Sequence, residues 1–261
     1  MTTHRLNEWH CLTWQEVGDL VAQGIDGAIL PVGATEQHGP HLGCGMDASI
    51  ADKLCRAAAA ATGVPLLPTL PYGCSIGHSK RWPGTLALQP KTLIDLVKDI
   101  GDWLYASGVR RLFIVNSHVT NQAPLRCALE MLRAEYDDMM IALLGSATLS
   151  QRVREKHFED AGDWHANAAE TALMQAVAPE LVREEKIAEA DDPDRTVDSV
   201  FAHPVNRTSL NGVTGAPSDA SREAGEELFA WMVEDLTSLI ERGMKETPPL
   251  AYSYHQSITE K

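Results

Sequence analysis

The stretch LPVGATEQHGPH at residues 30–41 decides how the rest of the chain is interpreted. Its first residues, together with residues 27–29, form a short apolar run that is typical of a buried strand. The second half places a carboxylate and two imidazoles close together, those of Glu36, His38 and His41. In an extended chain, side chains two residues apart point to the same face, so Glu36 and His38 would face the same space.

A third donor-type side chain follows this stretch. Asp47 comes nine residues after His38, beyond two glycines that allow the chain to turn back. A Glu, a His and an Asp arranged in this way suit a divalent metal ion such as Zn²⁺ or Mn²⁺. Two alternatives stay open at this point. The stretch can be a strand that ends in an ordinary polar surface loop, and Asp47 can be only the N-cap of the helix that follows.

The totals limit the classes of protein that this chain can belong to. Its 261 residues, 44% of them hydrophobic, predict a single domain over 1–261 with a substantial core. The net charge of −14 disfavours binding to nucleic acid and to anionic membrane surfaces. We find no run long enough for a membrane span and no apolar signal core at the N-terminus. Five scattered cysteines without C-x-x-C spacing predict a reducing, cytoplasmic location.

Alternating strands and helices predict the fold class. We expect strands over residues 27–29 with the first half of 30–41, and at 64–68, 111–115 and 139–144. We expect helices at 12–17, 48–61, 91–107, 124–136 and 147–157, after residues 164–171 to about Val177, and at 219–242. Strands that alternate with helices favour a parallel sheet covered on both faces, and hence an α/β fold. The acidic residues 181–200 are expected to form surface loop.

Ligands bind beyond the carboxyl ends of the strands in such sheets. Glu36 and His38 follow one predicted strand, and His118 follows another. His165 and Glu170 are five residues apart, which on a helix leaves them roughly 140° apart. We therefore expect His165 before a helix and Glu170 in its first turn, although both residues can also be ordinary surface groups.

Other motifs carry less weight. Residues 73–77 match G-x-S-x-G, but prolines on both sides disfavour the strand–turn–helix that a nucleophilic serine needs. His78 and Trp82, in the same long loop, are candidate substrate contacts. The remaining histidines are predicted to lie on the surface, namely His4, His10, His157, His203 and His255.

Taken together, these pieces resemble the creatininase family, also called the creatinine amidohydrolase superfamily. The resemblance follows the family order over nearly the whole chain. Its pieces are residues 30–42 with Asp47, Tyr72-Gly73 with His78, Pro83-Gly84-Thr85, Asn116-Ser117-His118 with Asn121, His165-Ala166 with Glu170-Thr171, and Asn211-Gly212-Val213 with Gly215.

The resemblance implies a three-layer α/β/α fold with a mostly parallel central sheet. It also implies one or two divalent ions per chain, Zn or Mn, and a homo-oligomer that is a hexamer in many homologues. By resemblance the metal ligands are Glu36, His38, Asp47, His118 and Glu170, with Asp47 as the bridge. His165 is the implied acid/base residue. Ser117, in a matching segment, and Trp164, directly before one, join His78 and Trp82 as candidate substrate contacts.

The sequence departs from true creatininases at two places. In those proteins the sequence after the third strand resembles His-Tyr-Glu-Asn, and its Glu also ligates metal. This chain has Thr120 at the position of that Glu. The tryptophans that close over creatinine also lack clear counterparts, since residues 145–147 read Gly-Ser-Ala and Trp164 directly precedes His165. We therefore expect a family member that is not a true creatininase.

The expected activity is metal-dependent hydrolysis of the C–N bond of a small amide or cyclic amide by a metal-activated water. One alternative is metal-dependent ring opening of a diketo-cyclitol of the 3-dehydro-inosose type. Another is a non-catalytic, ligand-binding member of the family, because a fold alone does not determine a function.

Overall fold

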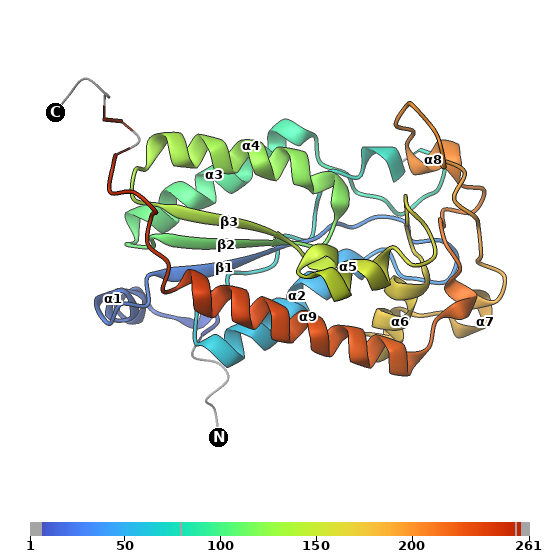
Figure 1. The fold of residues 1–261 in the computed structure, drawn as a ribbon, viewed down its shortest axis with the longest axis horizontal. Helices are drawn as coiled ribbons and strands as arrows, with labels where there is room; N and C mark the ends of the chain where they lie inside the picture. Colours follow the sequence, from blue (N-terminus) through green and yellow to red (C-terminus); the bar gives the residue numbers. More distant parts are fainter. Residues whose placement is uncertain (1–6, 79, 254, 257–261) are drawn as a thin grey trace.

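Three parallel strands form the centre of the molecule in the computed structural model, which describes residues 7–78, 80–253, 255 and 256 (Figure 1). Their order is β1 (Gly27–Val32), β2 (Arg111–Asn116) and β3 (Met140–Gly145). The three strands are in step, since Val32 pairs with Asn116 and Asn116 with Gly145. All three carboxyl ends therefore lie at one edge of the sheet.

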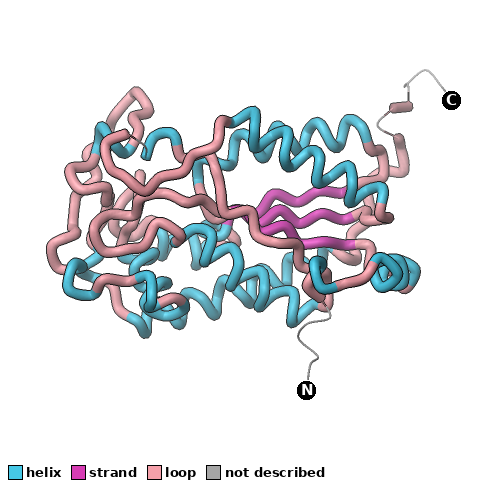
Figure 2. Tube along the Cα trace, turned by 180° about the vertical axis from the view of Figure 1, so that it is seen from behind, coloured by secondary structure: helices cyan, strands magenta, loops and turns pink. Residues whose placement is uncertain are grey.

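Helices cover both faces of this sheet. α3 (Pro90–Ala106) and α4 (Gln122–Glu135) pack on one face, and α2 (Met46–Thr62) and α9 (Arg222–Gly243) on the other (Figures 1 and 2). Alternate strand residues separate the two cores: Leu30 lies in the core with α3 and α4, and Ile29 in the core with α2 and α9. This period of two is the reason that one short strand can be buried on both faces. The predicted α/β/α fold class is confirmed.

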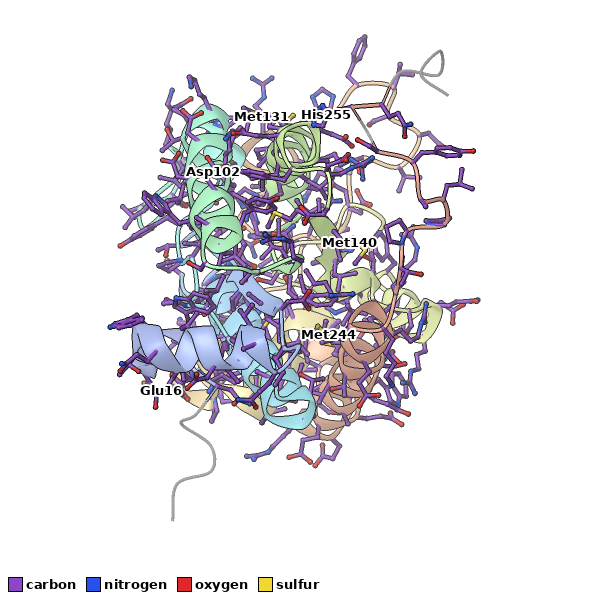
Figure 3. The ribbon with its side chains drawn as sticks, turned by 90° about the vertical axis from the view of Figure 1, so that its left-hand side faces the viewer. Glu16, Asp102, Met131, Met140, Met244 and His255 are labelled. Carbon is purple, nitrogen blue, oxygen red and sulfur yellow. The ribbon has the colours of Figure 1, made fainter. Side chains whose placement is uncertain are left out.

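Local signals set the helix ends. α1 (Trp14–Ala22) begins with a capping box, because the Thr13 hydroxyl accepts a hydrogen bond from the Glu16 amide and the Glu16 carboxylate accepts one from the Thr13 amide. α2 ends at Gly63, whose φ of 76° lies in the left-handed region that glycine adopts easily. Figure 3 looks along the strands from their amino ends, with Glu16 on α1 and Met140 at the start of β3.

The predicted strand at 64–68 is wrong. Leu66 makes only isolated bridges, to Glu8 and to Ile29, so the described residues contain three strands instead of four. Pro65 and Pro68 lack the amide protons that a continuous ladder needs.

The later helices are shorter than predicted. The segment 147–157 divides into a 3-10 turn at Ser146–Thr148 and α5 (Gln151–His157), and α6 (Ala168–Val177) follows. The segment that was expected to be acidic loop holds α7 (Glu184–Ile187), and α8 (Val205–Thr208) follows it. Over the described ranges, no helix has both the length and the apolar character that crossing a membrane requires.

Candidate metal centre

The loops at the carboxyl edge of the sheet are held together by backbone contacts. A Cβ on Gly33, just after β1, would lie 2.5 Å from the Ala48 backbone, so only glycine permits this approach to α2. The Ser117 hydroxyl, just after β2, donates to the Asp47 carbonyl at 2.6 Å. Asp47 is the second residue of α2 and Gly45 is its N-cap, so the N-cap alternative for Asp47 is wrong.

Five buried side chains meet at this edge in two overlapping groups. Glu36, Asp47 and His118 form one group, and His38, Asp47 and Glu170 form the other; in each group the donor atoms lie within 4.8 Å of one another. Asp47 belongs to both groups, which is the arrangement of a carboxylate that bridges two ions. The chain therefore presents two adjacent sets, each with two carboxylates and one imidazole.

The hydrogen bonds of the two histidines determine which ring nitrogen faces the centre. His38 donates from Nδ1 to the Glu36 carbonyl at 3.2 Å, which leaves Nε2 3.5 Å from Asp47 Oδ1. His118 donates from Nε2 to the Cys74 carbonyl at 3.1 Å, which leaves Nδ1 3.3 Å from both Glu36 Oε1 and Asp47 Oδ2. Metal-binding histidines commonly have their second nitrogen fixed in this way.

The charges at the centre fit a divalent cation. Glu36, Asp47 and Glu170 are buried, and in the part of the chain that the structure describes no lysine or arginine pairs with them. Both Glu36 carboxylate oxygens, Asp47 Oδ2 and His38 Nε2 are buried without a hydrogen-bond partner. Unpartnered buried groups of this kind are costly unless an ion coordinates them.

The pKa values of these groups reflect the crowded negative charge. Burial raises the pKa of Glu170 to about 7, and Asp47 also raises it. Burial alone would lower the pKa of His38, but the Asp47 carboxylate raises it to about 10. The centre therefore takes up positive charge, as protons or as metal ions.

His165 lies beside the metal centre, between His38 and His78. Its ring centroid is 4.4 Å from that of His38 and 4.3 Å from that of His78. Nε2 donates to the Gln37 carbonyl at 2.8 Å, and Nδ1 lies 3.7 Å from Glu36 Oε1. Burial and the neighbouring His38 lower the pKa of His165 well below its usual value, so the ring is neutral. His165 also forms a third possible donor group with Glu36 and His38.

A cavity of about 310 Å³, here called the inner cavity, opens onto these residues. His78, Ser117 and Trp164 line it, as their assignment as substrate contacts requires. Trp82 is not among the lining residues, so its prediction as a substrate contact at this cavity is not supported; the guanidinium carbon of Arg81 lies 4.8 Å from the centre of its ring. The lining residues are Glu36, Asp47, Gly77, His78, Ser117, His118, Val119, Thr120, Asp163, Trp164, His165, Glu170, His203, Pro204, Val205 and Thr214.

Two residues near this cavity were missed by sequence reasoning. His203 is exposed, as expected, but lines the inner cavity. Gln37 is buried and donates to the Gly212 carbonyl at 3.1 Å, close to His165 and His78. Its position inside the ligand-rich stretch at 30–41 was the available signal.

The predicted surface position of His157 is wrong, because its side chain is buried against Trp164. His4 lies outside the described residues.

Two hydroxyl residues singled out in the sequence, Thr120 and Ser75, lie beside His118. The Thr120 hydroxyl contacts the Cys74 carbonyl and His118 Nε2, on the side of that ring away from the carboxylates. The Ser75 hydroxyl lies 3.3 Å from His118 Nε2, but only a three-residue 3-10 turn, Ile76–His78, follows it. This context differs from the strand–turn–helix that a nucleophilic serine requires.

Comparisons with known proteins agree with this geometry. A family model, Creatininase, described as creatinine amidohydrolase, matches residues 10–240. The chain is similar to creatinine amidohydrolase of Pseudomonas putida, with 31% identity over 91% of this chain and 96% of the relative. It is also similar to the mycofactocin precursor peptide peptidase of Mycobacterium ulcerans, with 32% identity over 82% and 84%.

Solved structures of creatininase superpose closely on the chain. A manganese form has a TM-score of 0.81 at 29% identity and covers 92% of this chain and 99% of its own. A Zn-Zn form of a mutant has a TM-score of 0.79 at 28% identity, with 90% and 97% covered. The family, metal and fold predictions are confirmed: the chain belongs to the creatininase family and is a metal-dependent hydrolase of that family.

Proposed function

We propose that this protein hydrolyses the C–N bond of a small amide or cyclic amide. The observation that carries the proposal is the pair of buried donor groups that share Asp47 and face a cavity of substrate size. Glu36 and His118 would complete one ion site, and His38 and Glu170 the other. Bound ions would supply a Lewis acid for the amide carbonyl and lower the pKa of a water molecule.

The protein side chains divide the remaining work. His165 offers an unprotonated Nδ1 beside Glu36, so it can accept a proton and then donate it to the leaving nitrogen. The Gln37 carbonyl fixes the other nitrogen and hence the orientation of the ring. His78, Ser117 and Trp164 would contact the substrate from the cavity wall.

We also propose that the chain acts as one domain in the cytoplasm and assembles as a homo-oligomer, with a hexamer as the first form to test. All five cysteines are free, which suits a reducing compartment. Measurement of the molar mass in solution tests the assembly.

Metal analysis combined with a substrate panel tests the function. Protein purified without chelator should contain about one or two divalent ions per chain. It should release an amine from a formamide in the panel, or open the ring of a cyclic amide to give the corresponding amino acid. Chelation should abolish turnover, and added Zn²⁺ or Mn²⁺ should restore it. Full activity after chelation would contradict the proposal. If the chelated protein stayed active and Ser75→Ala then lost that activity, a serine hydrolase would be favoured.

The same panel separates the alternatives. Turnover of a keto-cyclitol without nitrogen release would identify the ring-opening activity. Metal-loaded protein that binds panel compounds and turns none of them over would identify a non-catalytic family member.

A further inference from the structure

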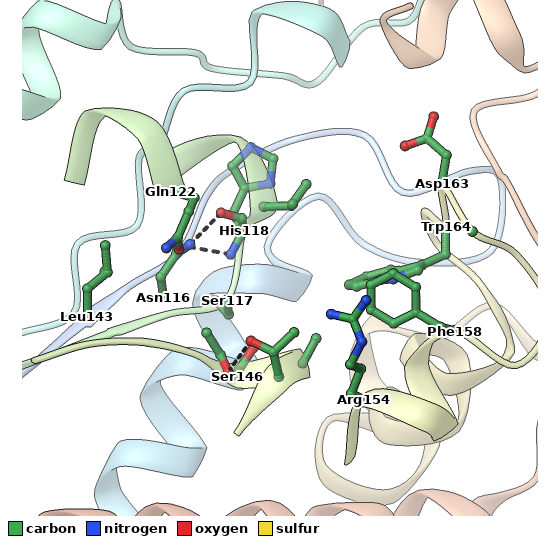
Figure 4. Close-up of a pocket in the computed structure, with 15 residues that line it drawn as sticks. Asn116, Ser117, His118, Gln122, Leu143, Ser146, Arg154, Phe158, Asp163 and Trp164 are labelled. Atoms are coloured by element: carbon green, nitrogen blue, oxygen red, sulfur yellow. Dashed lines mark hydrogen bonds between the residues drawn. The ribbon is translucent and has the colours of Figure 1, made fainter. Parts of the chain in front are cut away.

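A second cavity lies beside the inner cavity and has no role in the function proposed above. Figure 4 shows this side cavity, which has a volume of about 350 Å³. Five residues line both cavities, namely Ser117, His118, Val119, Asp163 and Trp164. A substrate whose amide lies at the metal centre can therefore extend past Trp164 into the side cavity.

The wall of the side cavity is aromatic and apolar. Trp164 packs edge-to-face against Phe158, with ring centroids 5.7 Å apart, and both rings line the cavity. Val119, which lines both cavities, is 68% exposed. Such a wall suits an apolar or aromatic part of a ligand.

One cation lines this cavity. Arg154 projects from α5, and its guanidinium carbon lies 4.5 Å from the centre of the Phe158 ring (Figure 4). Within the described residues it forms no ion pair, whereas Arg152, two residues earlier, pairs with Glu234 and Asp235. Arginine stays charged at all working pH values, and its planar fork matches a carboxylate.

The single carboxylate that lines the side cavity does not neutralise this charge. Asp163 forms no ion pair with Arg154 in the described part of the chain, and its carboxylate points away from Arg154 in Figure 4. The cavity thus joins an aromatic wall to one available guanidinium.

From this arrangement we propose that Arg154 is a specificity residue that binds a carboxylate of the substrate. The substrate class is an amide with an apolar or aromatic group and a carboxylate on the side away from the bond that is cleaved. This inference rests on the proposed function for the cleavage step, but the binding that it requires can be measured without turnover.

The test compares an acid with a neutral compound of the same shape. Calorimetry on metal-loaded protein measures the Kd of 3-phenylpropionate and of 3-phenylpropan-1-ol. We expect Arg154→Gln to weaken binding of the acid about tenfold, as for a hydrogen-bonded charge pair, and to leave binding of the alcohol unchanged. Lys156→Gln is the matched control, because it removes one positive charge from the same helix at a residue that does not line the cavity.

Each outcome decides the question. Equal affinity of wild type and Arg154→Gln for the acid would overturn the proposal, since the carboxylate would then bind elsewhere, for example at the metal ions. A change in molar mass in Arg154→Gln would also overturn it, by making Arg154 a contact between subunits. Arg154-dependent binding without any amide turnover would instead refute the proposed hydrolysis and leave this inference standing.

Discussion

Replacement of His165 by alanine tests the proton-transfer step of the proposed mechanism. The ring has one nitrogen free for chemistry, Nδ1, because Nε2–H donates to the Gln37 carbonyl at 2.8 Å. That free nitrogen lies 3.7 Å from Glu36 Oε1, at the edge of the donor groups. Removal of the ring would therefore remove a base and leave the five proposed metal ligands in place.

The expected size of the effect follows from this geometry. A positioned general acid or base contributes about 10²–10⁴-fold in rate, which corresponds to about 3–5 kcal/mol of activation free energy. We expect kcat of His165→Ala to fall by that factor on the substrate that the panel identifies. The pKa of His165 lies well below its usual value, so the ring is already unprotonated near neutral pH. Its contribution should therefore not change between pH 6 and 8.

Metal content separates proton transfer from coordination. His165→Ala should retain its ions by elemental analysis, whereas His118→Ala should lose metal and activity together. A near-normal kcat in His165→Ala would refute the catalytic role. Loss of metal in His165→Ala would identify His165 as a metal ligand. Glu36, His38 and His165 do form a third group of possible metal donors.

Four further predictions address the metal centre, the substrate and the fold. Metal removal should lower the Tm by about 10 °C in thermal denaturation, since ligand at a thousand times its Kd stabilises by about 4 kcal/mol. In metal-free protein the Tm should also fall as pH rises from about 6.5 toward 10. The pKa of His38 is about 10 in the folded protein and about 6.5 in the unfolded chain, so the stability that its proton contributes is lost over this range. A constant Tm would contradict this. Creatinine should be a poor substrate, with kcat/KM below about 10⁴ M⁻¹s⁻¹ in an amide-hydrolysis assay, given Thr120 and the altered tryptophans. Gly33→Ala should lower stability by about 1–3 kcal/mol in denaturant unfolding, because its Cβ would meet the α2 backbone, whereas Gly18→Ala, with nothing within 4 Å, should not.

The sequence predicted the parts of the fold that depend on local pattern. The apolar run that starts at residue 27 and the helix expected from residues 12–17 carry their own local signals, and both elements appear. The segment 64–68 has an apolar pattern and lies beside β1. Because of its prolines it forms only isolated bridges and no continuous ladder of backbone hydrogen bonds. An apolar pattern alone does not show whether a segment has enough amide donors to continue a sheet.

The side chains that line the cavities were harder to predict than the donors. Glu36, His38 and Asp47 lie close in sequence, so their convergence follows from one strand and one helix start. Arg154 in α5 and Phe158 at its C-cap line the side cavity, but the break between the 3-10 turn and the start of α5 at Gln151 was not predicted. His157, on the same helix, is buried. Which residues of a short helix are buried and which line a cavity could not be assigned from the sequence when the helix boundaries were uncertain.

The construction of the centre explains how a fold can assemble three buried carboxylates before an ion binds. Asp47 and Glu170 each occupy the first turn of a helix, α2 and α6, where the helix dipole favours negative charge. Glu170 also accepts a hydrogen bond from the Ala166 amide at 2.6 Å. Glu36 has neither support: histidine rings are near it, but both of its oxygens lack a hydrogen-bond partner. The ion site that includes Glu36 should therefore depend most on bound metal, so Glu36→Gln should reduce the Tm gained on metal addition while making the metal-free protein less sensitive to pH.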